Sequence, residues 1–169
     1  RNAFGYRDEL WAKIANMGWP GVLIPERYGG TGGSLTDAAV ILEELGKGPV
    51  PGPLFSAAVL GALTVMESGT EDQKYRILPN VASGRQILAM AITEPEYGWD
   101  PELVRMTARM SDSKYILNGT KLFIPDALAA THLICATQSE DTKGISLLVV
   151  DKRSHGISVR PLKGFTTDV

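Results

Sequence analysis

The residues best placed to do chemistry lie at positions 91–100, where an apolar run gives way to carboxylates, a proline and a glycine. The hydroxyl and backbone N–H of Thr93 could point at a ligand held against the preceding segment. Pro95 fixes its own φ, and Gly98 allows a close backbone approach. The pattern predicts the end of a strand that opens onto a binding loop.

Four acidic residues, Glu94, Glu96, Asp100 and Glu102, follow in this loop. They could bind a cation or include a catalytic carboxylate, but such a loop is more often a solvated surface, and we favour that interpretation. Glu94 is the exception. Because it directly follows Thr93, its carboxylate could orient the loop by accepting backbone N–H bonds.

A second candidate contact lies at Phe123 and Ile124, which precede Pro125 at the end of an expected hairpin strand. An aromatic ring at a strand end could stack on a planar ligand. Such a ring is more often part of the hydrophobic core. Both interpretations stay open at this point.

The remaining reactive residue types give weaker signals. Gly29–Gly33 could cradle a phosphate ahead of a helix, but its spacing matches no nucleotide fingerprint, and a flexible connector is the better interpretation. His132 and His155 have no Cys, Asp or Glu at metal-ligand spacing, so we predict no metal site. We find no Ser-His-acid arrangement. Cys135 is the single cysteine, and its apolar surroundings predict a buried small residue.

The bulk composition is that of an ordinary globular protein. The 169 residues are 44% apolar, and 17 Lys and Arg balance 19 Asp and Glu, which favours neither nucleic acid nor an acidic membrane as partner. No apolar stretch approaches the ~20 residues that span a bilayer, so we predict no membrane span. The lone thiol suits a reducing compartment, and we expect a cytoplasmic protein. The N-terminus lacks a signal-peptide pattern. The chain begins with Arg1 rather than with Met, so we expect a fragment.

Helical periodicity dominates the first half. Apolar residues recur at helical spacing in three segments, 10–17, 38–45 and 57–66. Ser34 with Asp37, and Thr70 with Gln73, have the spacing of capping boxes. The second box predicts a short helix that ends at Pro79.

After Gly84 the apolar period falls to about two, which is typical of strands. Strands are expected at 87–93, 105–110, 115–117, 121–124, 132–137, 145–151 and 157–162. Asn118-Gly119 is the strongest hairpin signal. We predict an α+β fold, with an all-helical domain over residues 1–86 followed by an antiparallel β-barrel or sandwich over residues 87–169. We expect this second domain to be truncated, because residues 164–169 supply no closing element.

Several ordered segments resemble the acyl-CoA dehydrogenase family, flavoenzymes that introduce a trans double bond between the α and β carbons of an acyl-CoA. The likeness covers almost the whole chain, and it lies in Gly18–Glu26, Tyr28–Gly30, Leu42–Gly46, Gly69–Lys74, Ala91–Pro95 with Gly98 and Asp100, and Leu117–Lys121. The segment beginning at Ala91 resembles the family signature, and the one beginning at Leu117 resembles its middle β-domain.

The resemblance implies FAD as cofactor, an acyl-CoA substrate and electron-transfer flavoprotein as electron acceptor. It also implies a homo- or hetero-oligomer that acts in fatty-acid or related lipid catabolism. The family's catalytic glutamate lies in a C-terminal four-helix bundle that these residues do not resemble. We therefore assign no catalytic residue to this chain.

By the same resemblance, the segment from Met90 to Trp99 lies along the flavin. The implied cofactor contacts are Met90, Ile92, Thr93, Gly98, Trp99, Phe123, Ile124 and Pro125. Thr93 would hydrogen-bond the ring, Phe123 would pack on it, and Trp99 would also contact the substrate. A donor aimed at the ring stabilises the negative charge that an arriving hydride brings.

Two residues depart from the family pattern. The family commonly has serine in place of Trp99 and threonine in place of Pro125, and neither an indole nor a proline can repeat those hydrogen bonds. The alternative is a non-catalytic, flavin-poor subunit that supports an active partner in a heteromeric enzyme. A two-domain binding module unrelated to flavin would require the ordered motifs to be coincidence.

Overall fold

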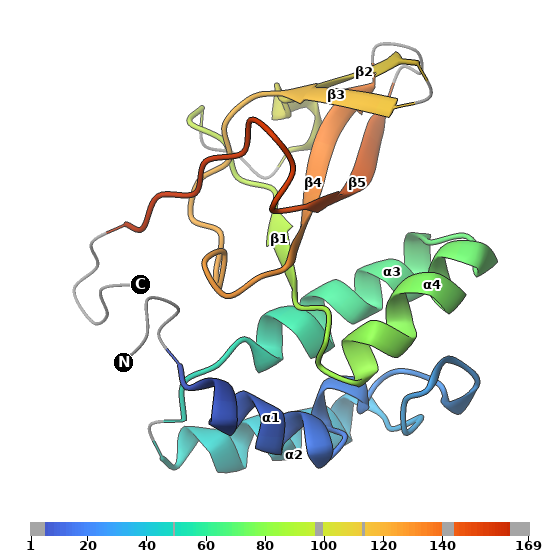
Figure 1. Ribbon diagram of the computed structural model, residues 1–169, viewed down its shortest axis with the longest axis vertical. Coiled ribbons are helices and arrows are strands. Elements are labelled where there is room, and N and C mark those ends of the chain that lie inside the picture. Colours follow the sequence, from blue (N-terminus) through green and yellow to red (C-terminus); the bar gives the residue numbers. More distant parts are fainter. Residues whose placement is uncertain (1–5, 49, 97–99, 113, 140–143, 163–169) are drawn as a thin grey trace.

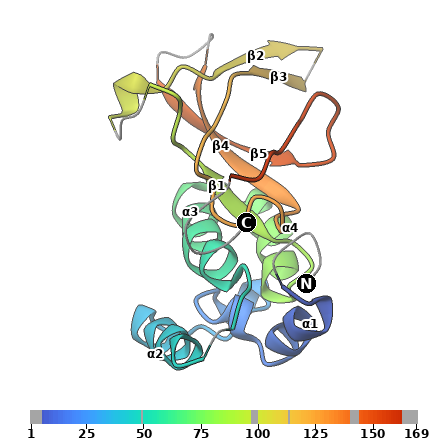
Figure 2. The ribbon, with the colours of Figure 1, turned by 90° about the vertical axis from the view of Figure 1, so that its left-hand side faces the viewer.

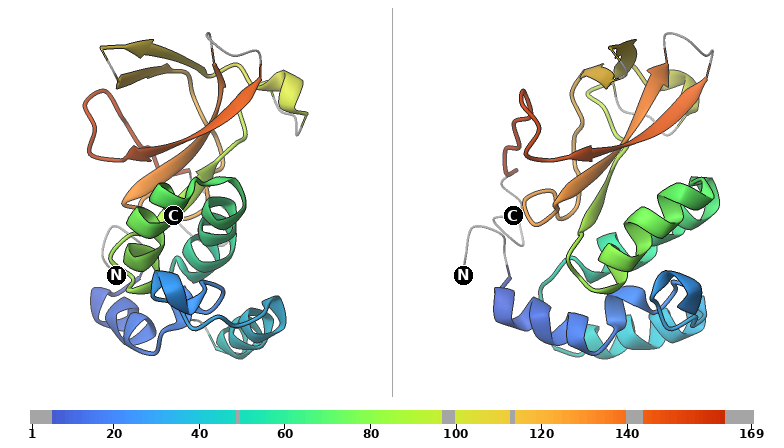
Figure 3. Two further views of the ribbon diagram at one scale, coloured as in Figure 1. Left: turned by 90° about the vertical axis from the view of Figure 1, so that its right-hand side faces the viewer. Right: turned by 45° about the vertical axis from the view of Figure 1, so that its right-hand side comes forward.

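The computed structural model describes residues 6–48, 50–96, 100–112, 114–139 and 144–162. Its helices lie at one end of the molecule and its sheet at the other (Figure 1). The α3–α4 pair lies between the sheet and the α1–α2 pair (Figure 3). The expected order, a helical part followed by a β part, is therefore confirmed.

Over its described residues, the helical part contains four α-helices, one π-helix and short 3-10 turns. The α-helices are α1 (Asp8–Asn16), α2 (Leu35–Gly46), α3 (Ala62–Ser68) and α4 (Glu71–Ala82), and the π-helix is η3 (Phe55–Gly61). The 3-10 turns are η1 (Trp19–Gly21), η2 (Glu26–Tyr28) and, in the β part, η4 (Pro101–Leu103). All three helical periodicities predicted from the sequence correspond to helices.

Side-chain caps begin two of these helices, as predicted. The Ser34 hydroxyl accepts from the backbone N of Asp37, whose carboxylate accepts from the backbone N of Ser34. Thr70 and Gln73 repeat the exchange at the start of α4. The predicted end of α4 at Pro79 is wrong, because the helix continues to Ala82 and buries residues beyond the proline.

The sheet is organised around one central strand. Its strands are β1 (Leu88–Ala91), β2 (Thr107–Ser111), β3 (Lys114–Asn118), β4 (His132–Ser139) and β5 (Ile145–Asp151). On one edge of β4, β1 pairs in parallel with its first half and β2 in parallel with its end, while β5 pairs antiparallel along the other edge. Figure 2 shows β2 and β3 as an antiparallel hairpin at the far end of the sheet.

The α+β class is confirmed, but the purely antiparallel barrel or sandwich is wrong. The sheet is mixed, and over the described residues it does not close into a barrel. The expected strands 121–124 and 157–162 have no strand pairing. Asn118-Gly119 is not the hairpin turn either, since β2 and β3 are joined earlier, after Ser111. Gly119 is instead needed for close packing, because a Cβ there would lie 2.8 Å from the Met106 Cβ.

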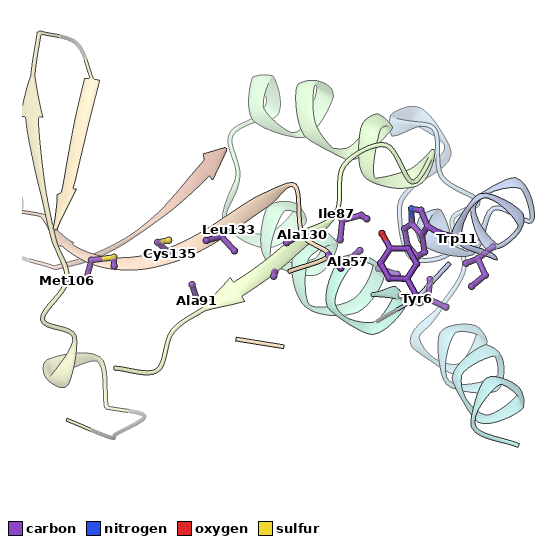
Figure 4. Packing of buried hydrophobic residues seen from close by; sticks show 14 residues of the cluster. Tyr6, Trp11, Ala57, Ile87, Ala91, Met106, Ala130, Leu133 and Cys135 are labelled. Carbon is purple, nitrogen blue, oxygen red and sulfur yellow. The ribbon is translucent and has the colours of Figure 1, made fainter. Parts of the chain in front are cut away.

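The hydrophobic core runs from the helices into the sheet. One cluster extends from Tyr6 and Trp11 to Met106 and Cys135 (Figure 4). A second cluster packs α3 and α4 against the opposite face of β1 and β4. The strand β1 therefore lies between two apolar layers, and this burial fixes where its C-terminal end emerges.

The glycine-rich segment 29–33 is neither a phosphate cradle nor a flexible connector. The backbone N–H groups of Thr31, Gly32 and Gly33 donate to backbone carbonyls of residues 21, 24 and 22. A Cβ at Gly30 would lie 1.9 Å from the Ile24 carbonyl oxygen. These glycines allow the loop to pack tightly. Among the helices in the described ranges, none is long and apolar enough to cross a lipid bilayer.

Candidate functional site

The end of β1 and the segment after β3 lie side by side. β1 ends at Ala91, and the half-buried Thr93 follows. The backbone N–H of Leu122 donates to the Thr93 carbonyl at 2.8 Å. This bond brings Thr93 close to Phe123, although the two residues lie far apart in the sequence.

Phe123 presents its ring at the surface, which contradicts the core interpretation. The residue is 57% exposed, and its φ of 52° lies in the left-handed region. The partly buried Ile124 packs against the first core cluster and anchors the segment, and Pro125 is exposed. Because Phe123 sits in irregular backbone rather than in a strand, its side chain does not follow strand alternation.

Met90 and Ile92 lie elsewhere, in a cleft of about 200 Å³ on the side of the sheet that carries Ala136 and Leu147. The Thr64 hydroxyl lies 3.6 Å from the Met90 sulfur. Thr93 and Phe123 do not line this cleft. The structure therefore divides the expected flavin contacts into two groups: Thr93 with residues 123–125, and Met90 with Ile92.

The cleft has apolar walls and an acidic rim. Its lining residues are Met90, Ile92, Glu94, Glu96, Asp100, Pro101, Leu103, Val104, Ala136, Ile145 and Leu147. Glu96 and Asp100 are exposed, which fits the solvated surface predicted for most of this acidic loop. The Asp100 carboxylate caps η4 by accepting from the backbone N of Glu102.

Glu94 is buried and orients the loop, as its position after Thr93 predicts. Its two carboxylate oxygens accept from the backbone N of Arg105 at 2.6 Å and of Met106 at 2.9 Å, and from Lys121 Nζ at 2.6 Å. Burial by itself would raise the pKa of Glu94, but the hydrogen bonds from Lys121, Met106 and Arg105 together hold it below its ordinary value. Glu94 is therefore ionised at neutral pH.

A second buried contact was not predicted from the sequence. Ser56, in η3, is 1% exposed and donates to Asp126 Oδ2 at 2.6 Å. Burial raises the pKa of Asp126, and the Ser56 hydrogen bond opposes that rise. The bond ties the helical part to the residue that follows Pro125. No sequence pattern marks this pair, because two distant segments supply it.

Cys135 and His132 lie in surroundings that shift their pKa values. Cys135 is buried, and burial raises the pKa of its thiol. His132 Nδ1 lies 3.0 Å from the Thr131 hydroxyl, and burial lowers its pKa. Over the part of the chain that the structure describes, no three His, Cys, Asp or Glu side chains form a metal-binding group. The expected contacts at Gly98 and Trp99 lie outside the described residues.

Comparison with known proteins accounts for nearly the whole chain. The model of the acyl-CoA dehydrogenase N-terminal domain matches residues 1–85, and that of the middle domain matches residues 89–167. The acyl-CoA dehydrogenase FadE12 of Mycobacterium tuberculosis is 34% identical over 164 residues, which cover 94% of this chain and 42% of the relative.

Solved structures agree with this match. An acyl-CoA dehydrogenase from Geobacillus kaustophilus is 32% identical with a TM-score of 0.80, covering 94% of this chain and 44% of that one. A chain of the ChsE4–ChsE5 complex from Mycobacterium tuberculosis is 28% identical with a TM-score of 0.81, covering 93% and 42%. The present chain thus spans about two-fifths of the length of these relatives. It belongs to the acyl-CoA dehydrogenase family and carries the family's N-terminal and middle domains.

Proposed function

We propose that this chain is part of a flavin-dependent acyl-CoA dehydrogenase that oxidises acyl-CoA thioesters to trans-2-enoyl-CoA in fatty-acid or related lipid catabolism. The observation that carries the proposal is the backbone hydrogen bond from Leu122 to Thr93, which places Thr93 beside the segment that presents the exposed Phe123. We also propose two domains, over residues 1–86 and 87–169, because α4 ends at Ala82 and β1 begins at Leu88.

This arrangement of Thr93 and Phe123 suits a planar ring system. When bound, FAD supplies the hydride acceptor. Phe123 would pack on the face of the ring, and Thr93 would direct its hydroxyl toward the ring edge. Such a donor is worth most where negative charge develops. We assign no catalytic base to this chain.

The implied partners follow from the same proposal. The substrate would be an acyl-CoA, and electron-transfer flavoprotein would accept the electrons from the reduced cofactor. A homo- or hetero-oligomer in the cytoplasm is the proposed setting. Neither nucleic acid nor a membrane span is part of it.

The test uses the full-length protein that contains this chain. The purified protein, after incubation with FAD and removal of free flavin, is expected to show flavin absorbance, and anaerobic addition of an acyl-CoA is expected to bleach it. A series of acyl chain lengths serves as the substrate panel. Absence of flavin absorbance after reconstitution contradicts the proposal, and flavin that no acyl-CoA bleaches contradicts the oxidation step.

A second candidate is the non-catalytic, flavin-poor subunit of a heteromeric acyl-CoA dehydrogenase. One observation favours it: Pro125, which has neither an N–H nor a hydroxyl to donate, is exposed in the segment beside Thr93. The structural relative in the ChsE4–ChsE5 complex is likewise found with a second named component.

Substituting the residues that the family commonly has at positions 99 and 125 tests whether Trp99 and Pro125 weaken flavin binding, as the flavin-poor subunit requires. Trp99→Ser with Pro125→Thr is expected to tighten FAD binding, because each recovered hydrogen bond to a charged group is worth ~1.5–3 kcal/mol. The dissociation constant for FAD, measured by flavin fluorescence, is the readout. Pro51→Thr, at another exposed proline, is the control. An unchanged dissociation constant shows that these two residues do not limit flavin binding.

A further inference from the structure

Glu94 and Lys121 form a buried ion pair between the two segments that carry the expected flavin contacts. Their side chains are 6% and 3% exposed, and Lys121 Nζ lies 2.6 Å from Glu94 Oε1. The same ammonium group donates to the Ile92 carbonyl at 3.0 Å, and the neighbouring Leu122 N–H donates to the Thr93 carbonyl. The pair therefore fixes the segment after β3 against the end of β1.

The same carboxylate holds a third segment. Glu94 accepts from the backbone N–H groups of Arg105 and Met106, which directly precede β2. The Met106 carbonyl in turn accepts from the backbone N of Gln138 in β4. Glu94 thus links the segment after β1 to the segment before β2, and both strands pair with the same edge of β4.

Stability alone does not explain two buried charges at this position. Replacing a buried ion pair by apolar side chains is often neutral or even stabilising, because both charges must be desolvated. A charged pair with several backbone partners, however, satisfies its hydrogen bonds in very few arrangements. Apolar side chains would allow one segment to slide past the other much more freely.

We propose that Glu94 and Lys121 are positioning residues that fix Thr93 relative to Phe123, so that one wall of the flavin site is formed before the cofactor arrives. The inference rests on the proposed function and adds the device that orders this wall. Neither residue needs to touch the cofactor. Their effect on FAD would act through the Leu122–Thr93 hydrogen bond and the backbone on either side of it.

The test is a double-mutant cycle in the full-length protein, with FAD as the probe. Glu94→Gln and Lys121→Met keep the approximate side-chain volume, and the double variant leaves no unpaired buried charge. Each single variant is expected to raise the dissociation constant for FAD about tenfold and to change the visible circular dichroism of the bound flavin. The double variant is expected to bind FAD more tightly than the product of the single effects predicts.

A second measurement, amide hydrogen exchange, complements the double-mutant cycle and does not require bound flavin. Amide hydrogen exchange at Leu122 and Met106 is expected to be faster in Glu94→Gln than in the wild type. The exposed pair of Glu44 and Lys47 is the control, because it has the same charges far from this wall. Glu44→Gln and Lys47→Met are expected to leave FAD binding and both amides unchanged.

The outcomes are distinct. Single variants that lower thermal stability but leave the FAD dissociation constant and the flavin dichroism unchanged overturn the inference and leave the proposed function standing. Strictly additive effects on FAD binding, or unchanged exchange at Leu122, also count against it. A wild-type protein that binds no FAD overturns the proposed function, and this inference falls with it.

Discussion

Glu94 shows how one side chain can serve three segments at once. Its carboxylate accepts from two backbone N–H groups and from Lys121, and its pKa lies below the ordinary value although burial acts in the opposite direction. A depressed pKa in the folded state means that folding favours the ionised form. Glu94 therefore contributes stability that depends on pH.

The sign of this pH dependence can be tested. The contribution of Glu94 is fully present above its unfolded-state pKa and is lost as the pH falls through the lower folded-state pKa. The free energy of unfolding in urea is expected to decrease more steeply in the wild type than in Glu94→Gln when the pH is lowered from about 5 to about 3. Glu96→Gln, at an exposed carboxylate nearby, should keep the wild-type slope. Equal slopes for the wild type and Glu94→Gln would contradict the assignment.

The sequence predicts the candidate site only in part at this scale. The role of Glu94 can be inferred, because a carboxylate that follows a strand end has backbone donors within reach. Lys121 cannot be identified as its partner, since a loop far along the chain supplies it. The exposure of Phe123 is equally hidden, because its left-handed φ removes it from the strand periodicity that predicted its environment.

Among the elements, α2 depends on its N-terminal cap. Ser34→Ala removes the hydroxyl that accepts from Asp37 N, and it is expected to lower the free energy of unfolding by about 1 kcal/mol. Thr36→Ala, at an exposed position inside the same helix, is the control and is expected to change stability by less than about 0.5 kcal/mol. Urea denaturation followed by far-ultraviolet circular dichroism measures both. A Ser34→Ala variant as stable as the wild type would show that the cap contributes little.

The sequence predicts helices more accurately than strands, for a physical reason. Caps and helical periodicity are local, so the start of α2 at Ser34 and of α4 at Thr70 can be read directly. A strand also needs a partner edge, and sequence does not show which edges are occupied. β1 and β2 take one edge of β4 and β5 takes the other. Residues 121–124 and 157–162 form no strand despite their apolar patterns.

At the scale of the whole molecule, the helical and β parts meet where η3 packs against β1. A Cβ added at Gly61 would lie 2.5 Å from the Leu88 Cβ, which is closer than side chains tolerate. Alanine has a higher helix propensity than glycine. A Gly61→Ala variant that is less stable than the wild type would therefore identify this contact as the cause. Gly61 therefore allows the close approach of the two parts.

Gly61→Ala is expected to lower the free energy of unfolding by about 1–3 kcal/mol, because neither backbone can move away without disturbing the core. Gly46→Ala provides the matched control, since its added Cβ would meet nothing within 4 Å. Thermal unfolding by calorimetry is the measurement. If Gly61→Ala matches or exceeds the wild type in stability, the contact is looser than the structure indicates.

The left-handed backbone at Phe123 has a consequence for any attempt to make this protein more heat-resistant. A phenylalanine in that conformation costs about 1–2 kcal/mol that glycine would not. A screen that rewards melting temperature alone should therefore favour Phe123→Gly and discard the exposed ring in the same step. Libraries designed to raise thermal stability therefore need a simultaneous selection for ligand binding at this position. Otherwise they will remove the exposed ring, which the fold presents at a cost in stability.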